Sequence, residues 1–358
     1  MPRNGDACVT TIMPKWGAAM DDARFGPGSA GSVRCDARAA WSQPPASVCA
    51  GDELRIDVSP CERVLRKTGN VALGRHSCAP SHPLFVGGAG PHSCTYIAFH
   101  RSSLRMRIGE WRSEVVTPIN VTFHQFGQRF SRESIGNEGD ECDWIAMPPA
   151  MARMVWPGAS ETVFPRPIAP IPAHLFLRQR GLFARVIAQS GDEDDAALEA
   201  DVIELTRAVV SSAGTYWSAA ARKRRRPKPI CLRRRFQIVE AAKSLLAAEP
   251  CAGFSVTELA YRLHCSVAHL SRTFHASTGL RITDYRQELR LRKGLLLLEE
   301  GGLEIGHIAN RLGFASHSHF TDAFRRRFLM NPSEYIRSKS AVALRAGARG
   351  VGRAPAVA

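Results

Sequence analysis

The pattern of apolar and polar residues divides the chain into a strand-like half and a helix-like half. Between residues 51 and 165, short segments such as LRMRI (104–108) and INVTFH (119–124) place an apolar residue at every second position. This period of two is typical of a half-buried β-strand, and Gly, Asn and Asp separate the segments as turn residues do. We therefore expect an antiparallel β unit over 51–165, closed as a barrel or a sandwich.

From the proline-rich segment VFPRPIAPIP (163–172) onward, the apolar period lengthens to that of a helix. Two amphipathic segments within 166–220, joined at Ser190-Gly191, predict a helical hairpin, and the acidic run 192–195 suits the start of its second helix. Its apolar stripe has two alternative partners, the β unit or a second copy of the chain. The basic run ARKRRRPKPICLRRR (221–235) follows, which we interpret first as a flexible linker and second as an arm that contacts phosphates.

The segment from residue 236 onward contains an internal repeat. LAYRL (259–263) matches IANRL (308–312), and CSVAHLSRTF (265–274) matches ASHSHFTDAF (315–324), at offsets of 49 and 50 residues. Each copy is a helix, a short turn and a second helix, which predicts two helix-turn-helix units over 236–338. Ser255, Ser266 and Ser316 precede helical segments as N-cap residues do. The segment 283–300 is long enough to be one helix that connects the copies.

Projection of the second helices at 100° per residue separates a core face from an outer face. Phe320, Phe324 and Phe328 form the core stripe of the second copy, and Leu270 and Phe274 form that of the first. The outer faces carry small polar groups and arginine, which suits helices that lie in the DNA major groove. The outer residues are Ala268, Ser271, Arg272 and His275 in the first copy and Ser318, Thr321, Asp322 and Arg325 in the second. The alternative interpretation is an ordinary solvated surface.

Charge is distributed unevenly along the chain, whose formal net charge is +15. Residues 1–221 carry 22 Lys and Arg against 23 Asp and Glu, whereas residues 222–358 carry 26 against 10. This asymmetry favours a nucleic-acid or anionic-membrane partner for the basic part, the alternative being a basic surface without a partner. No segment approaches the ~20 apolar residues that span a bilayer, and the N-terminus lacks the apolar stretch of a secretory signal. We expect a cytoplasmic protein whose ten cysteines are free thiols.

Residues 236–338 resemble the C-terminal DNA-binding domain of the AraC/XylS family of bacterial transcription regulators. The matching residues are Ala260, Ser266, Leu270, Ser271, Arg272, Phe274, Gly279, Tyr285, Arg290 and Leu291 in the first motif, and Ile308, Ala309, Gly313, Phe314, Ser316, Phe320, Phe324, Phe328, Pro332 and Tyr335 in the second. The N-terminal half resembles, more weakly, the cupin-like sensor domains of that family, in CAPSHPLF (78–85) and GDECDWIAMPP (139–149).

The resemblance implies a multi-domain α+β protein, in which a cupin-like antiparallel β-barrel and a helical hairpin precede an all-α domain with two helix-turn-helix motifs joined by a long helix. We accordingly divide the chain into a poorly ordered segment (1–50), a sensor domain (51–165), a hairpin with a dimerisation role (166–220), a basic linker (221–235), the DNA-binding domain (236–338) and a flexible tail (339–358). The implied partners are double-stranded DNA, RNA polymerase, a second copy of the chain and a small-molecule effector.

Each motif would place a recognition helix in one of two successive major grooves. Carried over by position, the base-facing residues are Ala268, Ser271 and Arg272 in the first copy and His317, Ser318, Thr321 and Asp322 in the second. Arg272 is the best candidate for a bidentate pair with guanine. Contacts with phosphates, which position the protein without specifying sequence, are expected from Ser266, Ser316, Arg325 and Arg326.

Two features depart from the family pattern, and a third, Asp322, is unusual on a face that meets DNA because a carboxylate repels phosphate. The connecting helix begins with Ile282 after Arg281, where the family usually has Pro after a capping Ser or Thr. Leu329 stands where Gly usually supplies a positive φ at a helix end, so we expect a different end to the helix 317–328. Asp322 on the outer face either accepts a hydrogen bond from cytosine or pairs with a neighbouring arginine.

Cysteines and histidines gather between residues 76 and 94, as His76, Cys78, His82, His92 and Cys94. Such residues bind Zn²⁺ in many proteins, but no CxxC pair is present here, so metal or thiol sensing is a minority hypothesis. His317 and His319 point ~200° apart on a helix and cannot readily share one ion. The β segment lacks the His-x-His pair of metal-dependent cupin enzymes, and the chain lacks the paired cysteines of a DNA-repair methyltransferase.

We therefore expect a sequence-specific DNA-binding transcription regulator that responds to an effector through its N-terminal domain, with no catalytic residue, no cofactor and no metal. One alternative is a ligand-independent regulator whose N-terminal domain only dimerises or binds partners. A further alternative is an enzyme fused to a DNA-binding module.

Overall fold

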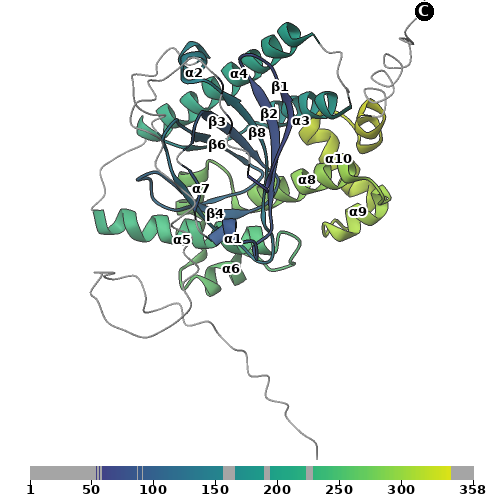
Figure 1. Ribbon diagram of the computed structural model, residues 1–358. Helices are drawn as coiled ribbons and strands as arrows, with labels where there is room; N and C mark the ends of the chain where they lie inside the picture. The colour runs from purple at the N-terminus through teal and green to yellow at the C-terminus, as the bar shows by residue number, and fades with distance from the viewer. Residues whose placement is uncertain are drawn as a thin grey trace, which may run out of the picture. The chain divides into compact units, whose positions relative to one another are not determined.

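The computed structural model describes residues 54–339, apart from residues 55, 57–58, 87, 91, 156–165, 189–193 and 223–228. The segments predicted as a poorly ordered N-terminus, as the turn of the helical hairpin and as a C-terminal tail after residue 339 lie outside the described residues, as does most of 221–228. Within the described part, a β-rich N-terminal region precedes a helical C-terminal region (Figure 1).

The larger sheet has six strands in the order β1-β2-β8-β3-β6-β9, and every neighbouring pair is antiparallel. Its strands are β1 (Glu62–Lys67), β2 (Ala72–Cys78), β8 (Asp140–Met147), β3 (Thr95–His100), β6 (Asn120–His124) and β9 (Ile168–Pro170). The smaller sheet has the order β5-β4-β7, with β5 (Glu114–Val116), β4 (Leu104–Ile108) and β7 (Phe130–Ser134). The antiparallel prediction is confirmed, but these strands form two sheets, and closure into a cupin barrel stays a prediction.

Burial on the strands follows the predicted alternation in β4 and departs from it in β6. In β4, Leu104, Met106 and Ile108 are buried while Arg107 is exposed. In β6 two of the positions predicted to be polar and solvent-facing, Thr122 and His124, are buried as well, and Asn120 is half-buried; His124 lies against Phe130 of the second sheet at a ring separation of 5.1 Å. The prediction of a half-buried strand is therefore wrong for β6, which is covered on both faces.

The predicted hairpin is formed by α3 (Ala173–Ala188) and α4 (Asp195–Arg222), and the second helix begins at the end of the acidic run. The apolar stripe of α4 joins one continuous core with residues of β3, β6 and β8. Trp217 of α4 contacts Phe123 of β6 edge to face at 5.5 Å. The β unit, rather than a second copy of the chain, therefore covers this stripe.

The helical region begins earlier than expected. Helix α5 (Pro229–Ala248) starts inside the segment predicted as a linker, seven residues before the expected boundary at 236. Proline is favoured at the start of a helix because its missing N–H has no partner there in any case. The prediction of a flexible linker over all of 221–235 is therefore wrong for residues 229–235.

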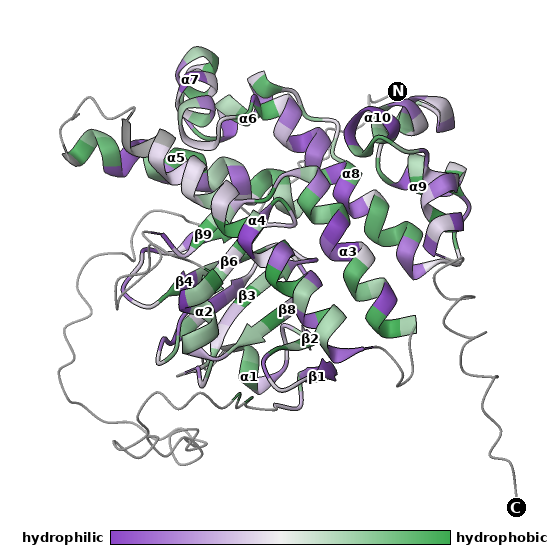
Figure 2. Ribbon diagram, turned by 90° about the horizontal axis from the view of Figure 1, so that it is seen from above, coloured by the Kyte–Doolittle hydropathy of each residue, from purple (hydrophilic) through white to green (hydrophobic). Residues whose placement is uncertain are grey.

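The remaining helices contribute to two cores that share one helix, and the second of these is continuous with the core of the β-rich region. Helices α6 (Val256–Arg262) and α7 (Val267–Thr278) pack with α5, and α9 (Ile305–Arg311) and α10 (His317–Phe328) pack with residues 332–339. The predicted connecting helix is α8 (Ile282–Glu300). Its first half supplies Tyr285 and Leu289 to the first core and its second half supplies Leu295 and Leu298 to the second. Figures 1 and 2 show α6 and α7 near one end of α8 and α9 and α10 near the other.

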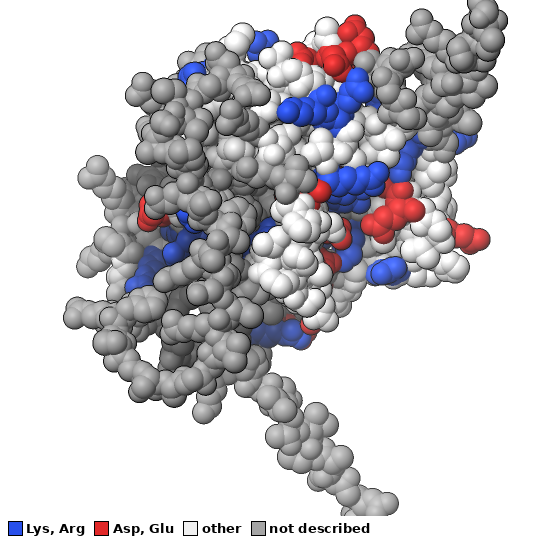
Figure 3. Space-filling model, viewed as in Figure 1, with Lys and Arg blue, Asp and Glu red and all other residues white. Residues whose placement is uncertain are grey.

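Two short helices, α1 (Pro83–Val86) and α2 (Pro149–Val155), complete the described elements. None of the described helices combines the length and the apolar character that a membrane crossing requires. On the face in Figure 3, the basic and acidic side chains of the described residues lie among one another.

Candidate DNA-binding helices

The first helix-turn-helix unit is α6, a short turn and α7. Ser255 and Ser266 cap the two helices, since their hydroxyl oxygens accept the N–H of Glu258 at 3.1 Å and of His269 at 3.2 Å. These are the predicted caps, and each satisfies one of the backbone donors that a helix start leaves without a partner. Ser266 keeps its own O–H as a donor, which is the group that a phosphate contact uses.

The outer face of α7 is exposed as its periodicity predicts. Ala268, Ser271 and Arg272 all lie at the surface, whereas Leu270 and Phe274 are fully buried. Arg272 donates from Nε to the carbonyl oxygen of Ala268 at 3.2 Å, one turn earlier on the same helix. Recognition of guanine uses two parallel N–H groups, and the Nη1 and Nη2 groups supply them without loss of the Nε bond.

The second unit repeats this geometry in α9 and α10. Ser316 caps α10 by accepting the N–H of His319 at 3.1 Å. His317, Ser318 and Asp322 are exposed, but Thr321 is half-buried, and its hydroxyl oxygen is shielded without a partner among the described residues. Thr321 therefore lies at the edge of the outer face, whereas the other three predicted base-facing residues of this helix lie on it.

The turns of the two units are equivalent, although their sequences differ in length. His264 and Gly313 occupy the same place with φ values of 50° and 72°, and their N–H groups donate to Tyr261 and Asn310 at 3.0 and 2.9 Å. The additional residue of the second copy comes after this position, at Ala315. Both motifs therefore have the left-handed residue that a tight helix-turn-helix connection needs.

The two recognition helices also end alike, although one ends with Leu. Gly279 has φ 76° and ψ −3°, and Leu329 has φ 60° and ψ 19°; each donates its N–H to the carbonyl four residues earlier. The predicted different end of helix 317–328 is therefore wrong. Leu329 takes the left-handed conformation that glycine usually supplies, with its side chain 87% exposed.

The charged side chains at the end of α10 are all exposed but differ in their partners. Asp322 lies 3.6 Å from Arg325, and both side chains are more than half exposed. Arg326 is exposed beside them. Arg327 is exposed as well, but it donates to the buried Glu288 of α8 at 2.9 Å. Of the two predicted roles for Asp322, the free chain shows the pairing with Arg325; in water such an exposed pair stabilises by at most ~1 kcal/mol.

The connecting helix α8 starts without a side-chain cap, as the sequence predicts from Arg281 in place of a capping Ser or Thr. Arg281 occupies the N-cap position of α8 with φ −68° and ψ 154°, and its side chain makes no capping hydrogen bond. The helix is held instead by Arg292, which is completely buried and donates to the carbonyl oxygens of Pro118 at 2.8 Å and Ile171 at 2.6 Å. This arginine therefore ties the connecting helix to the β-rich region.

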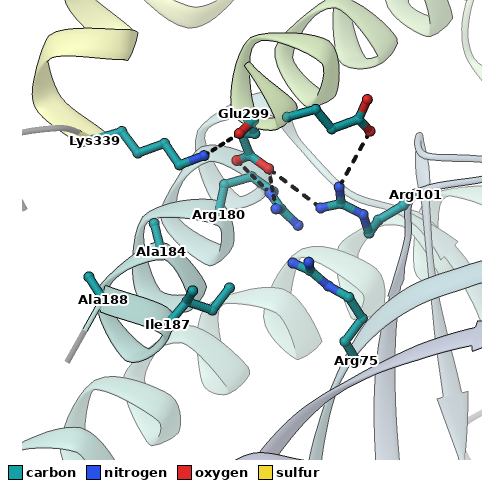
Figure 4. A pocket seen from close by; sticks show the side chains of 9 residues that line it. Arg75, Arg101, Arg180, Ala184, Ile187, Ala188, Glu299 and Lys339 are labelled. Carbon is teal, nitrogen blue, oxygen red and sulfur yellow. Dashed lines mark hydrogen bonds and ion pairs between the residues drawn. The ribbon is translucent and has the colours of Figure 1, made fainter. Parts of the chain in front are cut away.

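A charged cavity of about 300 Å³ lies where the β-rich region, α3 and the end of α8 meet (Figure 4). Four cationic side chains line it: Arg75, Arg101, Arg180 and Lys339. Glu299 and Glu300 supply carboxylates, and the short apolar side chains of α3 form one wall. These residues come from five separate segments with no common spacing, so no sequence pattern could have indicated this cavity.

The cations of this cavity contact a smaller number of carboxylates. Arg180 bonds to both Asp143 and Glu299, and Arg75 donates to Asp143 at 2.8 Å. Burial opposes the ionisation of Asp143, but Arg180, Arg101 and Arg75 outweigh it and lower the pKa of this carboxyl. Burial and the neighbouring Arg180 lower the pKa of Arg101, and burial lowers the pKa of Lys339. Burial is the first cause of both shifts, and the four cations share the three carboxylates of Asp143, Glu299 and Glu300.

Comparison with known proteins places the helical region in a family. A family described as a helix-turn-helix domain matches residues 259–338. The Msm operon regulatory protein of Streptococcus mutans is 30% identical over 97 residues, which are 27% of this chain and 35% of that protein. A putative AraC-like transcription regulator of Streptomyces antibioticus is 31% identical over 98 residues, which are 27% of this chain and 32% of that protein. The chain thus spans about a third of the length of these relatives.

Residues 259–338 form an AraC-type helix-turn-helix domain. The resemblance predicted from the sequence is therefore confirmed for this region. Among solved structures, a transcriptional regulator from Chromobacterium violaceum with an AraC-type DNA-binding domain is 29% identical; the match covers 29% of this chain and 93% of that chain, with a TM-score of 0.28. The AraC-type domain contains both capped helices and both outer faces described above.

Proposed function

We propose that this protein is a sequence-specific DNA-binding transcription regulator rather than an enzyme. The observation that carries the proposal is the duplicated outer face, because α7 and α10 have the same capped start, the same left-handed end and exposed polar side chains. The relatives of the AraC-type domain, which are named as regulators, support the same conclusion.

The connecting helix sets the separation of the two faces. Helix α8 has 19 residues, which at 1.5 Å per residue gives a length of about 28 Å. Successive major grooves on one side of B-DNA are about 34 Å apart. A rigid helix of this length, packed into both cores, therefore favours simultaneous entry of α7 and α10 into successive grooves.

Within this function, individual residues take different roles. Arg272, Ser271 and Ala268 of α7 and His317 and Ser318 of α10 face base edges, with Thr321 at the margin and Asp322 paired with Arg325. Ser266, Ser316, Arg325 and Arg326 contact phosphates, where a hydroxyl or guanidinium positions the protein without specifying sequence. Homodimerisation, a contact with RNA polymerase and a cytoplasmic location stay predictions from the family resemblance.

The β-rich region acts as the sensor in this proposal, and the charged cavity is where we place its effector. The cavity brings four cations together with Glu299, Glu300 and the buried Asp143, so it has room for one more negative charge. Its volume is at the lower end of the range for small-molecule sites. A small organic anion is therefore the expected effector, and it would contact both the β-rich region and the end of α8.

Mapping of bound fragments from a library of genomic DNA tests the proposal. The full chain should enrich fragments that share two short motifs in adjacent helical turns. Enrichment without a common motif would leave only non-specific DNA binding. Addition of small carboxylates to the same assay tests the effector separately. A shared DNA motif supports the regulator whether or not a carboxylate changes how much of that DNA is bound.

A further inference from the structure

The cysteines and histidines that gather between residues 76 and 94 do not form one group in the fold. His76 bonds to Glu62 at 2.7 Å, His92 stacks on Phe130 at 5.2 Å, and Cys94 lies in a separate apolar cluster. Only Cys78 and His82 lie together, and the residue that completes their group is Cys61, which the sequence spacing did not indicate.

The three side chains are held by elements that leave them little freedom. Cys61 directly precedes β1 and Cys78 ends the neighbouring strand β2. The backbone of Ser77 donates to the carbonyl oxygen of Cys61 at 2.9 Å, which fixes the two cysteine backbones side by side. His82 lies in the turn that follows, where its N–H donates to Ala79 at 3.0 Å and its carbonyl accepts from Phe85 at 2.8 Å.

The atoms that could bind a metal converge in this corner. One Sγ or ring nitrogen from each residue lies within 4.8 Å of the others, and Cys61 Sγ is 3.7 Å from His82 Nδ1. Tetrahedral Zn²⁺ has Zn–S bonds of about 2.3 Å and Zn–N bonds of about 2.0–2.1 Å, which separate S and N by about 3.6 Å. The observed separation therefore fits a shared tetrahedral ion with little movement.

The surroundings of Cys78 suit a neutral metal–thiolate group. Nη2 of Arg132 lies 3.7 Å from Sγ of Cys78, and Nη1 donates to the carboxylate of Asp140 at 2.7 Å. The cation beside the sulfur is therefore itself balanced by a carboxylate. Two thiolates and one divalent cation would leave the buried group without net charge.

We propose that Cys61, Cys78 and His82 bind one Zn²⁺ ion, with a water molecule as the fourth ligand. On binding, both S–H bonds break, two Zn–S bonds form, and the two protons pass to solvent; no residue is oxidised or reduced. At His82 Nδ1 the ion replaces the contact with Cys61 and the N–H of Leu84, which lies at 3.2 Å. Thiolate and imidazole ligands favour Zn²⁺ over Mg²⁺ or Ca²⁺.

Such an ion would join the edge of the larger sheet to the turn before α1. A ligand that binds only the folded chain stabilises it in proportion to the logarithm of its concentration above Kd. Bound zinc would therefore stabilise the pairing of β1 with β2 at the edge of the larger sheet. The fraction of chains that hold zinc would rise with the zinc concentration. This role goes beyond DNA binding and does not depend on it.

The test uses the full chain without a polyhistidine tag. Metal analysis should find about one Zn²⁺ per chain, and replacement by Co²⁺ should give the absorption of a cobalt–thiolate bond. Cys61→Ser and His82→Gln should each lose the metal, whereas Cys94→Ser and Cys142→Ser should keep it, because these two buried thiols lie in another cluster. Equal metal content in all four variants, or none in the parent chain, would overturn the proposal.

A second measurement avoids variants that fold poorly. In the unaltered chain, Zn²⁺ should protect Cys61 and Cys78 from alkylation, while the exposed Cys231 reacts at the same rate with or without metal. Peptide mass analysis assigns the alkylated sites. No difference in protection on addition of a chelator, or recovery of a Cys61–Cys78 disulfide from freshly purified chain, would exclude the zinc site.

Discussion

Leu329 offers a direct way to test the reasoning on helix ends, because Leu329→Gly should make the protein more stable. Leu329 has φ 60° and is 87% exposed, so the substitution loses little buried apolar surface. Release of a non-glycine residue from the left-handed region is worth about 1–2 kcal/mol. The greater freedom of glycine in the unfolded chain offsets about 0.5–1 kcal/mol of this. The expected net gain in the free energy of unfolding is therefore about 0.5–1 kcal/mol.

Urea unfolding followed by circular dichroism measures this gain, and the first motif supplies the matched control. Gly279 has φ 76°, and a Cβ at this position would meet no atom within 4 Å. Gly279→Ala therefore isolates the conformational cost and should lower the free energy of unfolding by about 1 kcal/mol. If Gly279→Ala destabilises while Leu329→Gly leaves the unfolding midpoint unchanged or lower, the equivalence of the two helix ends is refuted.

Three further predictions concern DNA affinity, the junction of the two regions and pH. Asp322→Asn should strengthen binding to all DNA sequences alike and steepen the salt dependence by up to about one unit, because it releases Arg325 for phosphate; a loss of discrimination at one base pair in a binding titration would instead indicate a cytosine contact. Arg292→Met should lower the free energy of unfolding in urea by about 2–4 kcal/mol, since it leaves two buried carbonyls without their donor and leaves Glu288 with Arg327 alone; a change below about 0.5 kcal/mol would contradict this role. Burial lowers the pKa of His92 and His100 from 6.5 to about 4, so below pH 6.5 the unfolded chain binds protons that the folded chain does not. Stability should therefore be complete above pH 6.5 and fall by about 2 kcal/mol per histidine between pH 6.5 and 5, and equal urea midpoints at pH 7 and 5 would contradict this burial.

The helix-turn-helix units were predictable because their signals are local. The phenylalanine spacing of α10 and the serines before α7 and α10 determine a buried face and a capped start within one or two turns of helix. The positions of the caps and the connecting helix therefore follow from short stretches of sequence. The left-handed Leu329 could not be predicted in this way, because packing on both sides of the residue imposes a conformation that its own side chain disfavours.

Features that depend on contacts between distant segments were not visible in the sequence. The alternation in β6 predicted an exposed polar face, but β7 of the second sheet covers His124. A run of basic residues indicated a linker up to 235, although α5 packs against α7 and already begins at Pro229. Cys61 is separated from Cys78 by most of a β-hairpin, so only the pairing of β1 with β2 brings the two thiols together.

The central claim is that α7 and α10 read DNA sequence, and the ratio of specific to non-specific affinity tests it most directly. The measurement compares the parent chain with Arg272→Ala and Arg325→Ala on a selected operator and on unrelated DNA, over a range of salt concentrations. Arg272→Ala should lower the ratio by about 1–3 kcal/mol in free energy, whereas Arg325→Ala should weaken both DNAs alike and reduce the salt slope by about one. An unchanged ratio for Arg272→Ala would contradict the claim that the outer face of α7 contacts bases.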